Sequence, residues 1–337
     1  AALLETIGSG AVTAPFYEVE HSEVIIVIGA NPTENHPVAA TFFKNAAKKG
    51  SKLIVMDPRG HALKKHATHM LQFKPGSDVA LLNSIMHVII EDDLFNDEYI
   101  KKQTSGFDDL RRHLKNYPPE IMEEQTGIDA DLIREVAHLY AKTSKGIIFW
   151  GMGVSQHVHG TDNARCLISL ALMTGNVGRR GSGLHPLRGQ NNVQGASDAG
   201  LIPMMYPDYQ LVEKDDKQNF FEKFWNTPLD DKKGLTVVEI MDAIHENTIK
   251  GMYILGENPA MSDPDLNHAR EALQILEHLV VQDIFLTETA TYADVIFPAS
   301  AWPEKNGTAT NTNRQVQMGR KAIDAPGAAK EDWWITN

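Results

Sequence analysis

Cysteine is almost missing from this sequence. Cys166 is the single cysteine among 337 residues, which excludes an internal disulfide framework, a cysteine-rich zinc site, and an iron–sulfur cluster held by these residues alone. Because Cys166 lies in an apolar helical pattern, we interpret it as a small core residue rather than a metal ligand. Any iron–sulfur centre that serves this chain must therefore be bound elsewhere.

Long apolar runs and clusters of basic residues are missing as well. No run approaches the roughly 18 apolar residues of a membrane-spanning helix, so we expect no membrane insertion by this chain. The formal net charge is -12, and no Lys/Arg cluster offers the charge that binding to a phosphate backbone requires, which argues against a nucleic-acid partner. A hydrophobic content of 42% predicts a soluble globular chain of about two domains.

Apolar strands alternate with helices through the first half of the sequence. The β-branched run at 24–29 predicts a strand buried on both faces of a parallel sheet, and a helix is expected over 38–49. Further strands are predicted at 52–57, 70–73 and 146–150, and further helices at 79–91, 97–101, 129–143 and 162–173. This order predicts an α/β fold of the doubly wound type, with a mainly parallel sheet.

Part of this pattern occurs twice. Residues 29–32 (Gly-Ala-Asn-Pro) return as residues 256–259 (Gly-Glu-Asn-Pro), each after an apolar strand and before a helix. The next strands end in Asp57 and Asp283, and a third landmark aligns Phe73-Lys74-Pro75 with Ile296-Phe297-Pro298. Three landmarks in the same order predict two related domains. The alternative is chance reuse of common turn chemistry.

The duplicated unit has the chemistry of a nucleotide site. A glycine after a strand permits a sharp turn, and the helix that follows offers unpaired N–H groups to an anion such as a pyrophosphate. An aspartate at the end of the next strand can accept hydrogen bonds from ribose hydroxyls or a guanine edge. Neither copy has a Gly-x-Gly-x-x-Gly or Gly-Lys-Ser/Thr motif, so an ordinary NAD or ATP site is poorly supported. Two copies suggest two nucleotide-bearing ligands or a two-part cofactor, unless one copy is a structural relic.

The stretch at 187–198 combines amide side chains, one arginine and glycines without helical or strand periodicity. Fixed donors beside glycines indicate a loop that holds an anionic or polar ligand close to the backbone. A polar crossover between two domains is the other interpretation.

These residues carry a family resemblance that extends over essentially the whole chain. The sequence resembles the molybdopterin guanine dinucleotide oxidoreductases of the dimethyl-sulfoxide-reductase superfamily, and most closely the catalytic (alpha) subunits of formate dehydrogenases. The motifs that carry the resemblance are residues 28–32, 57–59, 150–153, 172–178, 188–195 and 304–308. It implies two related Rossmann-like αβα domains, which we expect at 1–190 and 191–300, followed by a crossover segment at 301–337. Each domain would hold one pterin guanine dinucleotide, and the pair would hold one molybdenum or tungsten ion.

The resemblance also assigns cofactor-binding positions. Those expected around the first dinucleotide are Gly29, Asn31, Glu34, Asp57, Arg59, Gly76 and Asp78. Those expected around the second are Gly256, Glu257, Asn258, Gln282, Asp283 and Thr287. Met152, Gly153, Gln156, Gly189 and Asn191 are expected near the pterins and phosphates.

Formate chemistry fits the arginine of the 187–198 stretch. Oxidation of formate removes a proton and two electrons, or a hydride, from a small carboxylate that must be oriented against an oxidised metal. A planar guanidinium can make two parallel hydrogen bonds to a carboxylate, which an ammonium group cannot do. The resemblance implies that Arg188 is the catalytic arginine that orients formate, and that Gln190 is the catalytic amide beside the metal.

The sequence also departs from the family pattern. The Cys or selenocysteine that ligates the metal, and the cysteines of a [4Fe–4S] cluster, are expected before Ala1, and a further domain is expected after Asn337. No residue of this chain is therefore predicted to bind the metal, and we interpret His157 and His159 as polar loop residues. Residues 1–337 alone are expected to be inactive towards formate.

Partners and location follow from the same resemblance. Electron-transfer subunits of the iron–sulfur, flavin/NAD or hydrogenase type are the expected partners. A cytoplasmic location is favoured, and a periplasmic one stays open. The alternative function is a non-catalytic subunit of an electron-transfer complex that keeps this fold without the pterins.

Overall fold

The computed structural model describes residues 2–337 and divides into two compact units. The first unit contains the residues up to Gln194 together with 310–315, and the second contains 195–309 and 316–337. The sequence analysis placed a boundary after residue 190 and a separate segment at 301–337, whereas here most of that segment belongs to the second unit. No helix of the described residues is long and apolar enough to cross a membrane.

The first unit is built around a five-stranded parallel sheet. Its strand order is β3-β2-β1-β4-β5, the order of a doubly wound fold, and this confirms the predicted fold class. The strands are β1 (Val24–Ile28), β2 (Lys52–Met56), β3 (His69–Leu71), β4 (Gly146–Trp150) and β5 (Gly183–Pro186). Because successive side chains of a strand point to opposite faces, Ile25 and Val27 enter one apolar cluster while Ile26 and Ile28 enter another.

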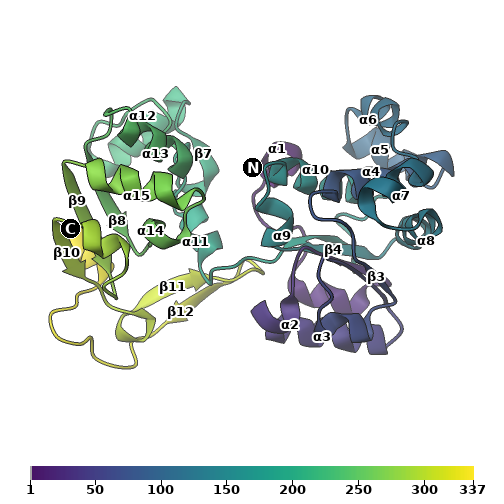
Figure 1. Ribbon diagram of the computed structural model, residues 1–337, viewed down its shortest axis with the longest axis horizontal. Coiled ribbons are helices and arrows are strands. Elements are labelled where there is room, and N and C mark those ends of the chain that lie inside the picture. Colours follow the sequence, from purple (N-terminus) through teal and green to yellow (C-terminus); the bar gives the residue numbers. More distant parts are fainter. Residues whose placement is uncertain (1) are drawn as a thin grey trace. The chain divides into compact units, whose positions relative to one another are not determined.

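Helices cover both faces of this sheet (Figure 1). The short α2 (Pro32–Asn35) and α3 (Pro37–Lys48) lie on one side, and α4 (Asp78–Glu91), α8 (Ala130–Ala141) and α10 (Gly160–Met173) lie on the other. The remaining helices of this unit are α1 (Ala2–Ile7), α5 (Asp97–Gln103), α6 (Phe107–Leu114), α7 (Pro119–Thr126) and α9 (Met152–Ser155), with 3-10 turns η1 (Phe16–His21) and η2 (Ala62–His66).

Five helices of this unit were not predicted: α1, α2, α6, α7 and α9. Helices α6 and α7 each bury few side chains, and charged residues occupy most of their remaining positions. Helix α6 does present an apolar stripe of Phe107, Leu110 and Leu114 to the core, but each of the two helices has only eight residues, so the periodic signal is short. The 187–198 stretch also differs from expectation, because its second half forms helix α11 (Val193–Asp198).

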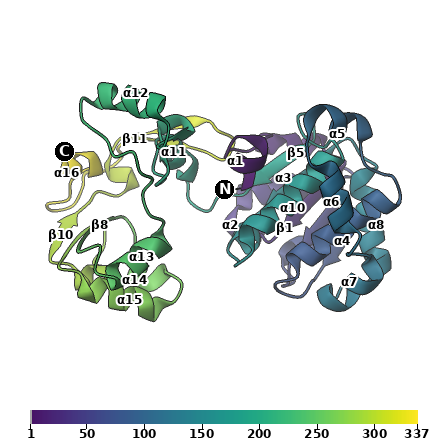
Figure 2. The same cartoon turned by 90° about the horizontal axis from the view of Figure 1, so that it is seen from above.

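The second unit has a smaller parallel sheet, with strand order β10-β9-β8. Its strands are β8 (Gly251–Leu255), β9 (His278–Asp283) and β10 (Val295–Pro298), and Figure 2 shows α13 (Val237–His245), α14 (Pro259–Ser262) and α15 (Leu266–Ile275) grouped beside β8. The other elements are α12 (Asp215–Trp225), α16 (Asp332–Thr336), η3 (Pro207–Tyr209), η4 (Thr289–Tyr292) and η5 (Trp302–Glu304), and the short strands β6 (Met205–Tyr206), β7 (Gln210–Leu211), β11 (Gly307–Thr310) and β12 (Val316–Gly319).

The two sheets repeat one arrangement. Strands β1, β2 and β3 correspond to β8, β9 and β10, and the register agrees, since Ile28 lies opposite Met56 as Leu255 lies opposite Gln282. The glycine that follows each first strand has a positive φ, 56° at Gly29 and 65° at Gly256. The N–H of each glycine donates to the carbonyl of the residue at the end of the second strand, at 3.0 and 2.9 Å.

One detail of the sequence interpretation was wrong. The register places Leu71 opposite Met56 and Phe297 opposite Gln282, so Phe297 corresponds to Leu71 rather than to Lys74. The third landmark was therefore aligned out of register by the similar Phe and Pro residues.

Candidate active site

The carboxyl ends of β1, β4 and β5 bring three loops of the first unit together. Parallel strands end at one edge of a sheet, where α/β folds bind their ligands. A cavity of about 750 Å³ lies at this edge, lined by the turn after β1, the turn after β4 and the loop after β5. Seven of the predicted cofactor positions line it: Gly29, Asn31, Asp57, Arg59, Met152, Gly153 and Gly189.

Glycines make the floor of this cavity possible. The turn after β1 and the turn after β4 touch, and a Cβ placed on Gly151 or Gly153 would lie 2.7 Å from the carbonyl oxygen of Gly29. No real side chain fits at such a distance, so the two backbones can meet only as glycines. In contrast, a Cβ on Gly189 would have no protein atom within 4 Å. Gly189 thus leaves open the space that a side chain would take from a ligand.

The other predicted positions of the first unit lie around this cavity rather than on its lining. Glu34, Gly76, Gln156 and Asn191 are absent from the described lining residues, although Pro75, next to Gly76, is present. Asp78 is 3% exposed at the start of α4, and burial raises the pKa of its carboxyl. Asp57 directs its Oδ1 to the backbone N–H of Arg59 at 2.8 Å, which shapes the turn after β2.

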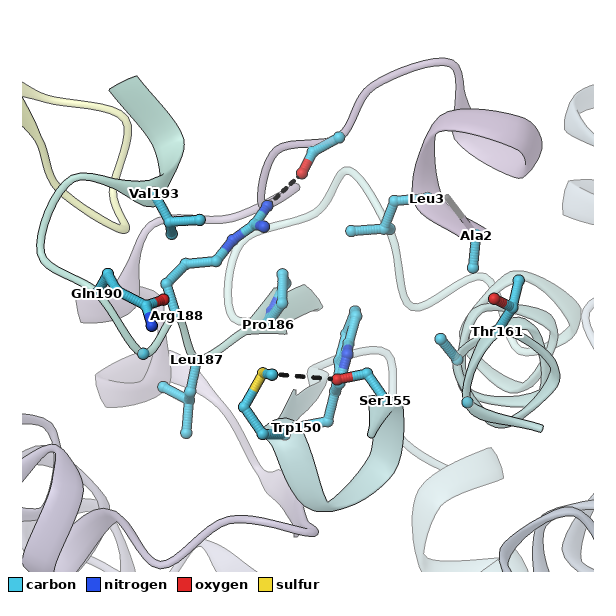
Figure 3. A pocket seen from close by; sticks show the side chains of 16 residues that line it. Ala2, Leu3, Trp150, Ser155, Thr161, Pro186, Leu187, Arg188, Gln190 and Val193 are labelled. Atoms are coloured by element: carbon cyan, nitrogen blue, oxygen red, sulfur yellow. Dashed lines mark hydrogen bonds between the residues drawn. The ribbon is translucent and has the colours of Figure 1, made fainter. Parts of the chain in front are cut away.

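Arg188 and Gln190 lie at a second, adjoining cavity of about 310 Å³ (Figure 3). The two cavities share the lining residues Gly151, Met152, Leu187, Gly189 and Gln190, so they adjoin in a cleft at this edge of the sheet. The Arg188 Nη2 donates to the carbonyl of Gly10 and lies 3.5 Å from Oε1 of Gln194, a side chain that is 3% exposed. These bonds fix the direction of the guanidinium at the wall of the cavity.

Sequence reasoning missed several residues of this cleft. Trp150, Ser155 and Thr161 line the second cavity (Figure 3), and His36 lines the first. The Nε2 of His36 lies 2.7 Å from the main-chain carbonyl oxygen of Arg188. Trp150 could have been included, because it ends a predicted strand. His36 could not, because its hydrogen-bond partner, Arg188, is distant in the sequence.

In the second unit, neighbouring residues of the chain hydrogen-bond the side-chain amides that the resemblance assigned to the second dinucleotide. Gln282 is fully buried, donating to Asp332 at 2.8 Å and accepting from Tyr253 at 2.5 Å. Asn258 accepts from the backbone and hydroxyl of Thr289 at 3.1 and 2.7 Å. The remaining positions are Gly256, Glu257, Asp283 and Thr287, of which Gly256 makes the turn after β8 and Asp283 accepts from the N–H of Ile284 at 2.6 Å.

Residues 2–337 contain no group of three or more His, Cys, Asp and Glu side chains that could hold a metal ion. Cys166 is half-buried among α10 side chains, and burial raises the pKa of its thiol to about 12. The Nε2 of His157 lies 2.7 Å from the carbonyl oxygen of Gly153. This bond connects His157 to the turn after β4.

Comparisons with known proteins give a consistent result. The pattern of the family described as molybdopterin oxidoreductase matches residues 4–337. An F420-dependent formate dehydrogenase subunit alpha of Methanocaldococcus jannaschii is 48% identical over 97% of this chain and 48% of its own length. Formate dehydrogenase H of Escherichia coli is 39% identical over 99% of this chain and 47% of its own length.

The chain thus spans about half the length of the curated relatives it matches. Among solved structures, acetylene hydratase from Pelobacter acetylenicus matches with a TM-score of 0.74 and 22% identity, covering 99% of this chain and 50% of that protein. At this identity the likeness concerns the fold.

Proposed function

Because the chain belongs to the molybdopterin oxidoreductase family, we propose that it is the central part of a molybdenum- or tungsten-dependent formate dehydrogenase, which oxidises formate to carbon dioxide. The observation that carries the proposal is the pair of adjoining cavities in the first unit. One is lined by the nucleotide-type turn at Gly29, the other by the guanidinium-bearing Arg188, and they share five lining residues. Relatives named as formate dehydrogenases support the choice of substrate.

The cleft has the properties that a molybdopterin guanine dinucleotide needs. Its larger cavity, about 750 Å³, falls within the size range of cofactor sites. The backbone at Gly189 leaves room for a close approach, and Asn31, Asp57 and Arg59 offer polar partners to a nucleotide. We propose that the positions that hold this dinucleotide are Gly29, Asn31, Glu34, Asp57, Arg59, Gly76, Asp78, Met152, Gly153, Gln156, Gly189 and Asn191.

A second dinucleotide is proposed for the second unit because that unit repeats the β1–β2–β3 arrangement and its glycine turn. The proposed positions are Gly256, Glu257, Asn258, Gln282, Asp283 and Thr287. Since protein partners occupy the side-chain amides of Asn258 and Gln282, their part would be to shape the turn and the strand end. When bound, the bis(molybdopterin guanine dinucleotide) supplies the metal that accepts the two electrons.

Arg188 has the chemistry to orient formate. The reaction converts formate to carbon dioxide, one proton and two electrons, so the C–H bond must be directed while the two oxygens are held. A guanidinium holds both oxygens of a carboxylate through parallel N–H bonds. The bonds to Gly10 and Gln194 preorganise its plane before formate arrives. Gln190, on the lining of both cavities, can offer an amide N–H to the same substrate.

Electrons leave the site through other parts of the complete enzyme. We propose a [4Fe–4S] cluster in the remainder of the full-length protein, and partner subunits of the iron–sulfur, flavin/NAD or hydrogenase type. The names of the relatives as alpha subunits support the presence of further subunits.

The decisive experiment measures the metal and pterin content of the full-length protein and its formate-dependent reduction of a dye. We expect molybdenum or tungsten with two pterin guanine dinucleotides per chain, and formate-dependent turnover. A native preparation without metal and pterin would contradict the enzyme and favour a non-catalytic subunit of the same fold.

A further inference from the structure

His36 is held rigidly between two helices of the first unit. It follows the one-turn helix α2 and precedes Pro37, which opens α3. Its N–H donates to the carbonyl of Pro32 at 3.0 Å, and its own carbonyl accepts from Ala40 at 2.9 Å. Because a residue before proline is restricted in φ and ψ, the backbone of His36 and its Cα–Cβ direction have little freedom.

The imidazole of His36 reaches the loop that carries Arg188. Its Nε2 lies 2.7 Å from the main-chain carbonyl oxygen of Arg188. A carbonyl can only accept, so Nε2 carries the hydrogen and donates it. The bond therefore ties the nucleotide-type turn after β1 to the backbone of the residue that faces the second cavity.

Helix capping does not explain this side chain. His36 is the N-cap residue of α3, but its side chain makes no capping hydrogen bond. Its Nδ1 is buried without a hydrogen-bond partner among the described residues, which costs free energy that an apolar side chain would not cost. The bond to Arg188 is the compensating contact.

The second copy of the turn shows that the fold does not need a histidine here. Asp263 ends the one-turn helix α14 and precedes Pro264, as His36 ends α2 and precedes Pro37. Its N–H donates to the carbonyl of Pro259 at 3.3 Å, the equivalent of the bond to Pro32. The equivalent backbone bond thus forms with an aspartate, although φ and ψ differ, at -140° and 62° for His36 and -73° and 145° for Asp263. The bond to Pro32 therefore does not require an imidazole, which is specific to the copy that carries Arg188.

We propose that His36 is a positioning residue for formate binding. Its hydrogen bond holds the main chain of Arg188 in the position from which the guanidinium can bind formate. This inference rests on the proposed role of Arg188. Arg188 is then held at two points. Gly10 and Gln194 bind its guanidinium, and His36 binds its main-chain carbonyl.

The test uses the full-length, cofactor-loaded enzyme with three variants. His36→Leu removes the donor, and His36→Gln keeps an N–H near the place of Nε2. His245→Leu is the matched control, because the Nε2 of His245 also bonds a main-chain carbonyl, that of His268 at 3.0 Å, in the second unit. Should His36→Leu fail to fold, His36→Asp replaces it, since aspartate occupies this place in the second copy.

Two readouts are combined: amide hydrogen exchange over residues 187–194, and KM and kcat for formate. For His36→Leu we expect exchange over this segment and KM each to rise by about tenfold, with a smaller change in kcat, as loss of one hydrogen bond predicts. His36→Gln should recover both, and His245→Leu should change neither. Wild-type exchange and KM in a folded His36→Leu would overturn the proposal.

The exchange measurement also separates the two proposals. If the enzyme oxidises no formate but exchange over 187–194 responds to His36→Leu and not to the control, the proposed function and the role in formate binding fail, while the bond by which His36 orders the Arg188 backbone is confirmed. If Arg188 variants lose formate oxidation while His36 variants behave as wild type in both readouts, the proposed function stands and the positioning role of His36 fails.

Discussion

Replacing Arg188 is the sharpest perturbation of the proposed enzyme. In Arg188→Ala two charge-assisted hydrogen bonds to formate are lost, each contributing about 1.5–3 kcal/mol. The transition state is then destabilised by about 3–6 kcal/mol, which corresponds to roughly a 10²- to 10⁴-fold fall in kcat/KM. Arg188→Lys keeps the charge but offers no parallel pair of donors, so about a 10- to 100-fold fall is expected.

The assay is steady-state formate oxidation by the full-length enzyme, with metal and pterin content measured on the same preparations. Arg112→Ala is a suitable control, because Arg112 is exposed and pairs only with Asp109 among the contacts described. Thermal unfolding checks that removing the Arg188 bond to Gly10 leaves the protein folded. If Arg188→Ala retained metal and pterin with kcat/KM within about threefold of wild type, the proposed role of Arg188 would be refuted.

Three further predictions concern packing and titration. Gly153→Ala places a Cβ 2.7 Å from the Gly29 carbonyl oxygen and should lower stability by about 1–3 kcal/mol in thermal unfolding. Gly189→Ala should keep the stability of the wild type and lose bound pterin. Equal Tm values for the two variants would contradict this. Burial raises the pKa of the Cys166 thiol to about 12, so the native thiol should resist iodoacetamide at pH 9 and react once the protein is unfolded. The contribution of the buried thiol to stability is complete below its unfolded pKa and is lost as pH rises above that value. Rapid labelling of the native protein would count against this. Burial lowers the pKa of His185 to about 4, so as pH falls the unfolded state binds the proton first, and stability falls by up to about 3 kcal/mol between about pH 6.5 and 4. His185→Leu should reduce the pH dependence of the urea-unfolding midpoint over that range. An unchanged pH dependence would argue against this.

Local chemistry made part of the site predictable. Gly29 was recognisable because a glycine between a buried strand and a helix start is typical of a sharp turn with a positive φ. Arg188 and Gln190 stood out because their segment lacks any periodicity, and the structure indeed brings both to one cavity. Such signals lie within a few residues of the feature that they predict.

Contacts between distant segments were not predictable in this way. His36 gave no signal, because its meaning depends on a carbonyl that only the closed sheet brings within 2.7 Å. The third landmark was misaligned because a Phe and a Pro follow β3 but lie inside β10, and only the backbone register identifies Leu71 as the equivalent of Phe297. Helix α6 was missed because its apolar stripe of Phe107, Leu110 and Leu114 extends over only eight residues.

The strand order of the first unit has a consequence for how the protein is made. Strand β1 can pair with β2 early in synthesis, but its other edge waits for β4, which begins only at Gly146. Until then the apolar run Val24–Ile28 exposes an unpaired edge, the kind of surface that misassembles in slowly folding chains. Strand β5 then joins β4, and the N–H of Leu187 bonds the carbonyl of Trp150 at 2.7 Å. The loop that carries Arg188 is therefore among the last parts of this unit to form, and a nascent chain chaperoned through that interval should yield more correctly folded protein than one left unprotected.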